Sequence, residues 1–259
     1  SWTVVEPNAL PLAIDRAIRV AMSPPMGPVH LAFYDRILDH DPIPTKIIPN
    51  SVPYPKAGIP TQEDISYLAN ELSEAKRPLI FFGDGISTDE SIKTICNLSN
   101  NLGIPLCGNF FQNILEHPMF CGAINTIEDI KPDVLFCLGI TQMSGGDFIQ
   151  KNDYRKFEIP DKVILAGSNP DNLKPVPNLV STILADETHI LNSLDSYIKT
   201  NISKSFSQRI KWAVDQSKKW KASTKLIAQK SPKTSNTIRP FILAETIDKE
   251  LSKAGGGIV

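Results

Sequence analysis

Between Lys76 and Leu194 the chain alternates short apolar runs with segments whose apolar residues recur at helical spacing. The apolar runs are continuous rather than alternating, which is typical of strands buried on both faces of a parallel sheet. We therefore predict an α/β fold, a three-layer αβα sandwich built on a parallel, Rossmann-like sheet and flanked by partial domains. The predicted strands are Leu79–Phe82, Ile104–Cys107, Val134–Leu138, Val163–Ala166 and Ser181–Leu184.

The loops that follow these strands begin with small residues. Gly83 follows the first strand, Gly139 the third and Gly167 the fourth. Because parallel strands end at the same edge of a sheet, these loops should lie in one row. Open α/β sheets bind their ligands at this edge, so we expect any ligand of the sheet to bind there.

Two further elements are predicted near the start of the chain. Residues Asn8 to Met22 predict a helix, and Val29–Phe33 predicts a strand. We expect no earlier element on which either could pack.

A proline-rich connector separates these elements from the predicted sheet. Six prolines lie between Asp41 and Thr61, and proline fixes φ and lacks a backbone N–H, so this stretch should be extended and semi-rigid. Thr61 then caps a helix, and either Ser87 or Thr88 caps the helix after the first strand.

The ends of the chain suggest that one complete middle domain lies between parts of two others. The last residues, Ala254 to Val259, have the pattern of a turn followed by the beginning of a buried strand. The expected division is a domain tail at 1–45, the connector at 46–62, a central domain at 63–198, a linker helix at 199–238 and the head of a further domain at 239–259.

Composition indicates an ordinary globular protein, with 41% hydrophobic and 21% charged residues. The formal net charge of −1 argues against nucleic acid as a partner, and no apolar run approaches the ~20 residues of a membrane span. None of the four cysteines forms a CxxC pair, and the four histidines lack metal-ligand spacing. We expect free buried thiols, a cytoplasmic location and no metal site in this chain.

Charge is nevertheless uneven along the chain. From Lys199 to Arg239 there are eleven lysines and arginines and one acidic residue, Asp215. Apolar residues at helical spacing in this segment predict an amphipathic basic helix. Such a helix could bind phosphate-rich ligands or acidic surfaces, or it could be a solvated linker docked on the central domain.

Several motifs, in their order, resemble the thiamine-diphosphate-dependent enzymes related to acetolactate synthase, benzoylformate decarboxylase and oxalyl-CoA decarboxylase. Those chains run from a pyrimidine-binding domain through a central domain to a diphosphate-binding domain. The resemblance covers nearly the whole chain. It rests on Ala17–Ala21 with the GPVH strand Gly27–Leu31, Lys76–Ile80 with Gly83–Ile86, the HP…G loop Leu115–Gly122, the strand Asp133–Gly139, and the helix Arg239–Leu251.

The resemblance implies that this chain is the central region of a 2-oxo acid decarboxylase or carboligase. The catalytic glutamate and the motif that binds Mg²⁺ and the diphosphate would then lie in other segments of the same polypeptide, so no catalytic residue is assigned here. The chain alone should be inactive. The parent would be a homodimer or homotetramer that binds thiamine diphosphate and magnesium.

The central domain of this family binds FAD in some members, ADP or coenzyme A in others, and nothing in many. A nucleotide here would lie at the carboxyl edge of the sheet, where glycine lets the backbone approach a pyrophosphate. Asp84 counts against this, since its carboxylate lies where a phosphate would. Tight turns alone would also explain the glycines, and an empty crevice is the favoured reading. The candidate cofactor-binding residues are Gly83, Asp84, Gly85, Gly108, Gly139, Ser168 and Asp186.

Three alternatives stay open. Gly83-Asp84-Gly85 followed by Asn109 could be the family's metal motif, although the residues around it favour the central domain. The chain could also be a stand-alone FAD- or ADP-binding module, or a scaffold that binds no ligand.

Overall fold

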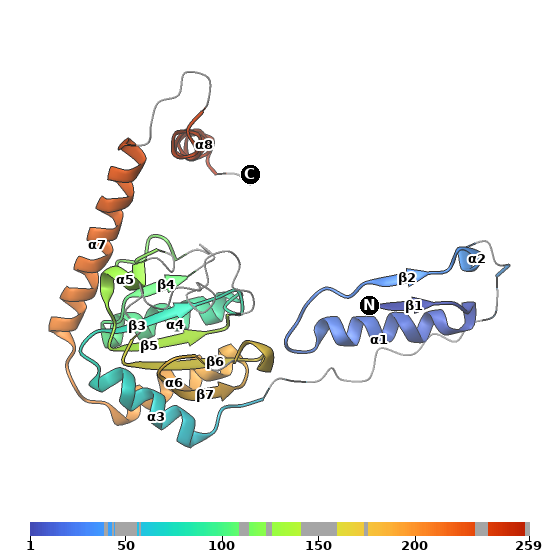
Figure 1. The fold of residues 1–259 in the computed structure, drawn as a ribbon, viewed down its shortest axis with the longest axis horizontal. Helices are drawn as coiled ribbons and strands as arrows, with labels where there is room; N and C mark the ends of the chain where they lie inside the picture. The colour runs from blue at the N-terminus through green and yellow to red at the C-terminus, as the bar shows by residue number, and fades with distance from the viewer. Residues whose placement is uncertain are drawn as a thin grey trace.

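A computed structural model describes residues 1–38, 41–42, 44, 56, 58–108, 114–122, 126–140, 160–173, 176–230 and 238–256. Its centre is a five-stranded parallel sheet in the order β4-β3-β5-β6-β7 (Figure 1). The strands are β3 (Pro78–Phe82), β4 (Leu106–Gly108), β5 (Val134–Leu138), β6 (Lys162–Gly167) and β7 (Leu179–Leu184). The predicted α/β fold is confirmed, and β3 lies inside the sheet between β4 and β5.

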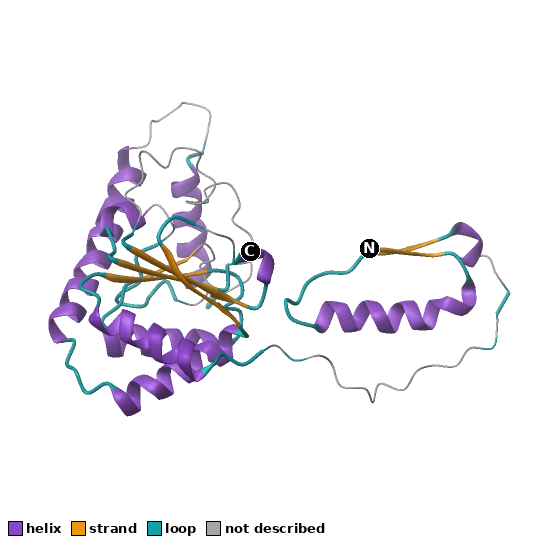
Figure 2. Cartoon of the chain, turned by 60° about the horizontal axis from the view of Figure 1, so that its bottom comes forward, coloured by secondary structure: helices purple, strands orange, loops and turns teal. Residues whose placement is uncertain are grey.

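The two faces of the sheet bury separate apolar clusters. On one face, α3 (Gln62–Glu74), α4 (Asp89–Leu102) and α6 (Glu187–Asn201) cover Ile80, Phe136 and Ile164. On the other face, α5 (Thr126–Ile130) covers Leu79, Leu135 and Val163. Figure 2 shows the strands of the sheet in orange with helices packed alongside. Because every strand residue of β3 and β5 is buried, both faces select apolar side chains, and this explains the continuous apolar runs.

β3 is the first strand of the sheet along the chain, and later strands are added on both sides of it. A bridge between Leu106 and Phe120 extends the sheet beyond β4, while β5, β6 and β7 follow on the other side of β3. This arrangement is the Rossmann order, and its topological switch point lies between β3 and β5.

Capping residues begin the helices that cover the sheet. Thr61 forms a capping box with Asp64 at the start of α3, as predicted. Thr88, rather than Ser87, forms the corresponding box with Ser91 at the start of α4. These side chains satisfy N–H groups that the first helical turn leaves without partners.

A small unit precedes the sheet. It contains η1 (Pro7–Ala9), α1 (Leu10–Met22), α2 (Asp35–Leu38) and a parallel pair of strands, β1 (Trp2–Val4) and β2 (Leu31–Phe33). The expectation that no earlier element packs here was therefore wrong, because β1 pairs with β2 over three residues. A strand of that length is too short to produce a recognisable sequence pattern. Most of the predicted connector at 46–62 lies outside the described residues.

Most of the basic segment forms α7 (Ser207–Lys230). The first half of this helix packs against the domain that contains the five-stranded sheet. The Ser217 hydroxyl donates a 2.6 Å hydrogen bond to the carbonyl oxygen of Phe120. The Trp220 ring meets the Phe120 ring edge-on, with centroids 5.5 Å apart. Further along, Leu226 and Ile227 are exposed, so the second half leaves the domain surface. The chain then forms α8 (Pro240–Lys253).

Arg209 is the main polar contact between α7 and the other helices. Its Nε donates to the carbonyl oxygen of Leu102 at 2.6 Å, at the end of α4. Its Nη1 donates to the carbonyl oxygens of Leu72 and Ala75 at 2.9 Å, at the end of α3. Burial lowers the pKa of Arg209 to about 10, which leaves the guanidinium charged at neutral pH. One cation therefore satisfies the free carbonyls of two helix C-termini.

Two expectations from composition can be checked against the described residues. All four cysteines are free, and Cys107, Cys121 and Cys137 are buried. Burial raises the pKa of Cys121 to about 12, which keeps it a thiol at neutral pH. In the described part of the chain, no helix is both long enough and apolar enough to cross a membrane.

We expect Leu135→Ala to lower the free energy of unfolding by roughly 2–5 kcal/mol, because it leaves a cavity in the middle of the sheet. Leu184→Ala is the matched control in the same sheet, since Leu135 is 0% exposed and Leu184 is 56% exposed. Urea denaturation measures both. Equal losses in the two variants would contradict the assignment of Leu135 to the core.

We expect Arg209→Lys to lower the free energy of unfolding by about 1.5–3 kcal/mol, because an ammonium group cannot reach carbonyls on two helices at once. Lys211→Ala, at an exposed position in the same helix, should change it by no more than about 0.5 kcal/mol. Urea denaturation followed by circular dichroism compares the two. Similar small changes would mean that the Arg209 contacts do not stabilise the fold.

Candidate functional site

The loops after β3, β5 and β6 meet at the carboxyl edge of the sheet, at the topological switch point. This is where the fold places ligands in open α/β proteins. The structure brings together Gly83, Gly85, Gly139 and Ser168 from the predicted set. A pyrophosphate could bind here only if these loops offered free N–H donors and enough space.

Backbone N–H groups of these loops already donate within the fold. The N–H of Gly83 donates to the carbonyl oxygen of Leu138 at 2.9 Å, and that of Gly85 donates to Gly139 at 2.8 Å. The N–H of Gly139 donates to Ala166 at 2.9 Å. A pyrophosphate bound by these three groups would have to replace hydrogen bonds that join neighbouring strands and loops.

Close packing explains why glycine occupies these positions. A Cβ on Gly83 would lie 2.5 Å from the carbonyl oxygen of Gly139. A Cβ on Gly85 would lie 2.7 Å from the Cα of Gly139. Gly139 also has φ +62°, a conformation that side chains disfavour. The loops after β3 and β5 thus touch, backbone against backbone.

Glu187 occupies the centre of this cluster, and sequence reasoning missed it. It is the first residue of α6 and is only 6% exposed. Its Oε1 accepts hydrogen bonds from the backbone N–H of Ser168 at 2.9 Å and from the Ser168 hydroxyl at 3.1 Å. Burial raises the pKa of Glu187, while the Ser168 hydrogen bonds act in the opposite direction. An acidic residue in a first helical turn normally suggests an exposed side chain, so the sequence offered no signal of this burial.

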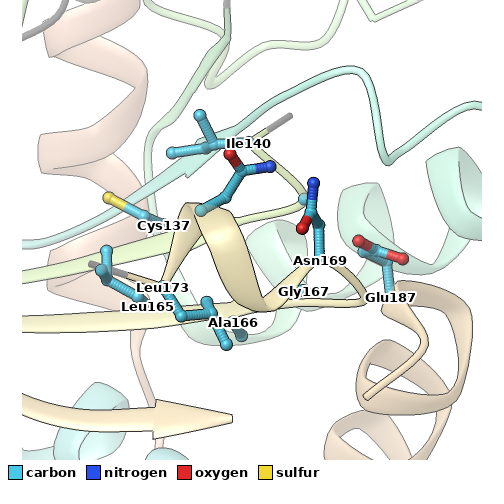
Figure 3. A pocket seen from close by; sticks show the side chains of 10 residues that line it. Cys137, Ile140, Leu165, Ala166, Gly167, Asn169, Leu173 and Glu187 are labelled. Carbon is cyan, nitrogen blue, oxygen red and sulfur yellow. The ribbon is translucent and has the colours of Figure 1, made fainter. Parts of the chain in front are cut away.

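The space that remains beside Glu187 is small. Figure 3 shows Glu187 at the start of α6, beside Gly167 and Asn169. The cavity there has a volume of about 10 Å³ and is lined by Cys137, Gly139, Ile140, Leu165, Ala166, Gly167, Asn169, Asn172, Leu173 and Glu187. That volume is close to the minimum for one water molecule. The cavity that the described residues form beside Glu187 is therefore far smaller than a nucleotide.

The other candidate residues have different surroundings. Asp84 lies in the turn between Gly83 and Gly85 and is partly exposed. Gly108 donates its N–H to Gly122, and a Cβ on it would lie 2.6 Å from the Phe82 ring.

Asp186 caps α6, since its Oδ1 accepts from the N–H of His189 at 3.0 Å. The structure therefore does not bring Gly108 into the group around Glu187, and it gives Asp186 a helix-capping contact beside that group. Asn109 lies outside the described residues.

The residues at this edge do not fit a magnesium-bound diphosphate. The N–H of Gly85 is already donated, and the buried carboxylate of Glu187 would repel a diphosphate placed against these glycines. Within the described ranges, no group of three or more histidine, cysteine, aspartate or glutamate side chains could hold a metal ion. We derive no cofactor chemistry from this edge.

No family model matches the chain. Oxalyl-CoA decarboxylases from Escherichia coli K12 and O157:H7 are each 28% identical to it over 146 residues, covering 54% of this chain and 26% of theirs. The crystal structure of benzoylformate decarboxylase from Polynucleobacter necessarius matches with a TM-score of 0.57 and 19% identity, covering 76% of this chain and 38% of that one. A Mycobacterium smegmatis protein assigned to the thiamin diphosphate-dependent enzymes matches with a TM-score of 0.59 and 20% identity, covering 79% and 40%.

The match to the oxalyl-CoA decarboxylases confirms the resemblance to the thiamine-diphosphate-dependent enzymes that the sequence motifs indicated. The two solved structures, at their level of identity, show the shared fold. The chain spans about a quarter of the length of the curated relatives that it matches.

We expect Gly85→Ala to lower the free energy of unfolding by about 1–3 kcal/mol, because the added methyl group would overlap Gly139 and the Glu187 carboxylate. Gly58→Ala is the control, since its Cβ would lie 3.5 Å from the nearest atom, an ordinary contact. That change should stay within about 1 kcal/mol. Thermal and urea unfolding compare the variants, and a neutral Gly85→Ala would show that the loops do not need this close approach.

Proposed function

We propose that this chain is the central region of a thiamine-diphosphate-dependent 2-oxo acid decarboxylase or carboligase. The match to oxalyl-CoA decarboxylase, 28% identical over 146 residues, is the observation that carries the proposal. The parallel sheet in Rossmann order is consistent with it. Because the relatives found are decarboxylases, decarboxylation is the favoured reaction class for the parent enzyme.

In this proposal the central domain is a scaffold, and the catalytic groups belong to other segments. Thiamine diphosphate and magnesium would be bound by the other domains of the same polypeptide, in a homodimeric or homotetrameric cytoplasmic enzyme. The donated N–H groups and the buried Glu187 support a structural rather than a cofactor-binding role for the carboxyl edge.

A stand-alone nucleotide-binding module is the second candidate. The observation in its favour is the Rossmann order, with loops gathered at the switch point. The small cavity beside Glu187 speaks against it. Titration calorimetry with ADP and with FAD tests for nucleotide binding. Because some central domains of the resembled family also bind these nucleotides, saturable binding would favour the module only if the domain exchange described below fails.

A domain exchange tests the central-domain proposal. Residues 63–198 should replace the matching region of Escherichia coli oxalyl-CoA decarboxylase and give a folded enzyme that still releases CO₂ in a thiamine-diphosphate-dependent reaction. The control chimera carries Leu135→Ala, which should reduce its thermal stability without altering the cofactor requirement. A chimera that folds but binds no cofactor, or one that never folds, would count against the assignment.

The chain by itself should show no decarboxylation of oxalyl-CoA or benzoylformate above background when thiamine diphosphate and Mg²⁺ are supplied. The physical reason is that the described residues provide no site that fits a metal-bound diphosphate. Measured CO₂ release with purified protein checks this. Robust turnover would overturn the assignment of the catalytic groups to other segments.

A further inference from the structure

A buried carboxylate lies where Rossmann-like sheets commonly place a phosphate. The Glu187 side chain is 6% exposed and bonds the N–H and hydroxyl of Ser168, the first residue after β6. Nucleotide phosphates in such folds are bound by the same kinds of group, a loop N–H and the beginning of a helix. Here the Glu187 carboxylate, at the beginning of α6, accepts the hydrogen bonds of the loop residue Ser168.

Three glycines at the ends of three different strands leave the space that the Glu187 side chain fills. A Cβ on Gly85 would lie 2.9 Å from the Glu187 Oε1, and one on Gly167 would lie 3.2 Å from it. A Cβ on Gly139 would lie 3.0 Å from the Glu187 Cγ. Gly85 follows β3, Gly139 follows β5 and Gly167 ends β6, so three neighbouring strand ends leave space for one carboxylate.

We infer that Glu187 is an internal ligand of the switch-point crevice, which occupies in cis the position of a bound oxyanion and thereby excludes nucleotides. The crevice is then an anion site whose occupant is part of the chain. Charge also disfavours a nucleotide here. Asp186 lies next to Glu187, so a bound phosphate would be repelled by two carboxylates.

The inference predicts chemical rescue. Removing the carboxylate in Glu187→Ala frees the Ser168 N–H and hydroxyl and opens a space that a small carboxylate can enter. Binding of formate or acetate to the folded state alone would stabilise it by mass action. Gln at the same position should still fill the space, so Glu187→Gln should show no such binding.

Thermal unfolding in sodium formate, with sodium chloride at the same ionic strength as the reference, tests this. Formate at about 100 mM should raise the melting temperature of Glu187→Ala by roughly 2–4 °C over chloride. It should leave the wild type, Glu187→Gln and the exposed control Glu116→Ala unchanged. Equal melting temperatures of Glu187→Ala in the two salts would overturn the inference.

A second measurement uses the wild-type protein and does not depend on how the variant folds. Calorimetric titration with ADP at low salt should give no saturable heat, because the anion position is taken. Stoichiometric binding of ADP to the wild type would show that Glu187 does not exclude nucleotides and would also overturn the inference. The domain-exchange result is independent of both outcomes.

Discussion

The close approach of the loops after β3 and β5 governs the carboxyl edge of this molecule. Neighbouring parallel strands bring their ends together, and here the backbones of Gly85 and Gly139 touch and share a 2.8 Å hydrogen bond. That contact uses the N–H group that would otherwise face a ligand. It also fixes the pocket into which Glu187 projects. The crevice of this fold is therefore a packed junction among the described residues.

The helical layer depends on a different kind of contact. The carbonyl groups at the ends of α3 and α4 lack intrahelical donors, as at every helix C-terminus. Arg209 supplies donors to both ends while its guanidinium lies 4.2 Å from the centre of the Phe206 ring. A basic segment that suggests a solvated surface in the sequence thus includes one cation with a structural role.

Sequence patterns could predict the sheet but not the centre of the site. Continuous apolar runs predict buried parallel strands, because both faces of such strands are covered and select apolar side chains. The glycines could be assigned to the carboxyl edge because they follow predicted strands, and parallel strands end at the same edge of a sheet. Their contact with Glu187 could not be predicted, since Gly85, Gly139 and Gly167 approach it only when two loops, the end of β6 and α6 come together. Arg209 was equally hidden, because its partners are backbone carbonyls, which leave no pattern in side-chain composition.

The second half of α7 sets the distance between the docked half of the helix and the chain after Lys230. An α-helix rises about 1.5 Å per residue, so the ten residues from Lys221 to Lys230 span roughly 15 Å beyond the Trp220 contact. Their apolar side chains Leu226 and Ile227 stay exposed on the described surface. A helix of this length resists bending, and its docked half is held by Arg209 and Ser217. The chain after Lys230 is therefore joined to the sheet through a stiff helical spacer. A rotation of α7 at the Phe120 contact would displace the far end of the helix as a rigid body.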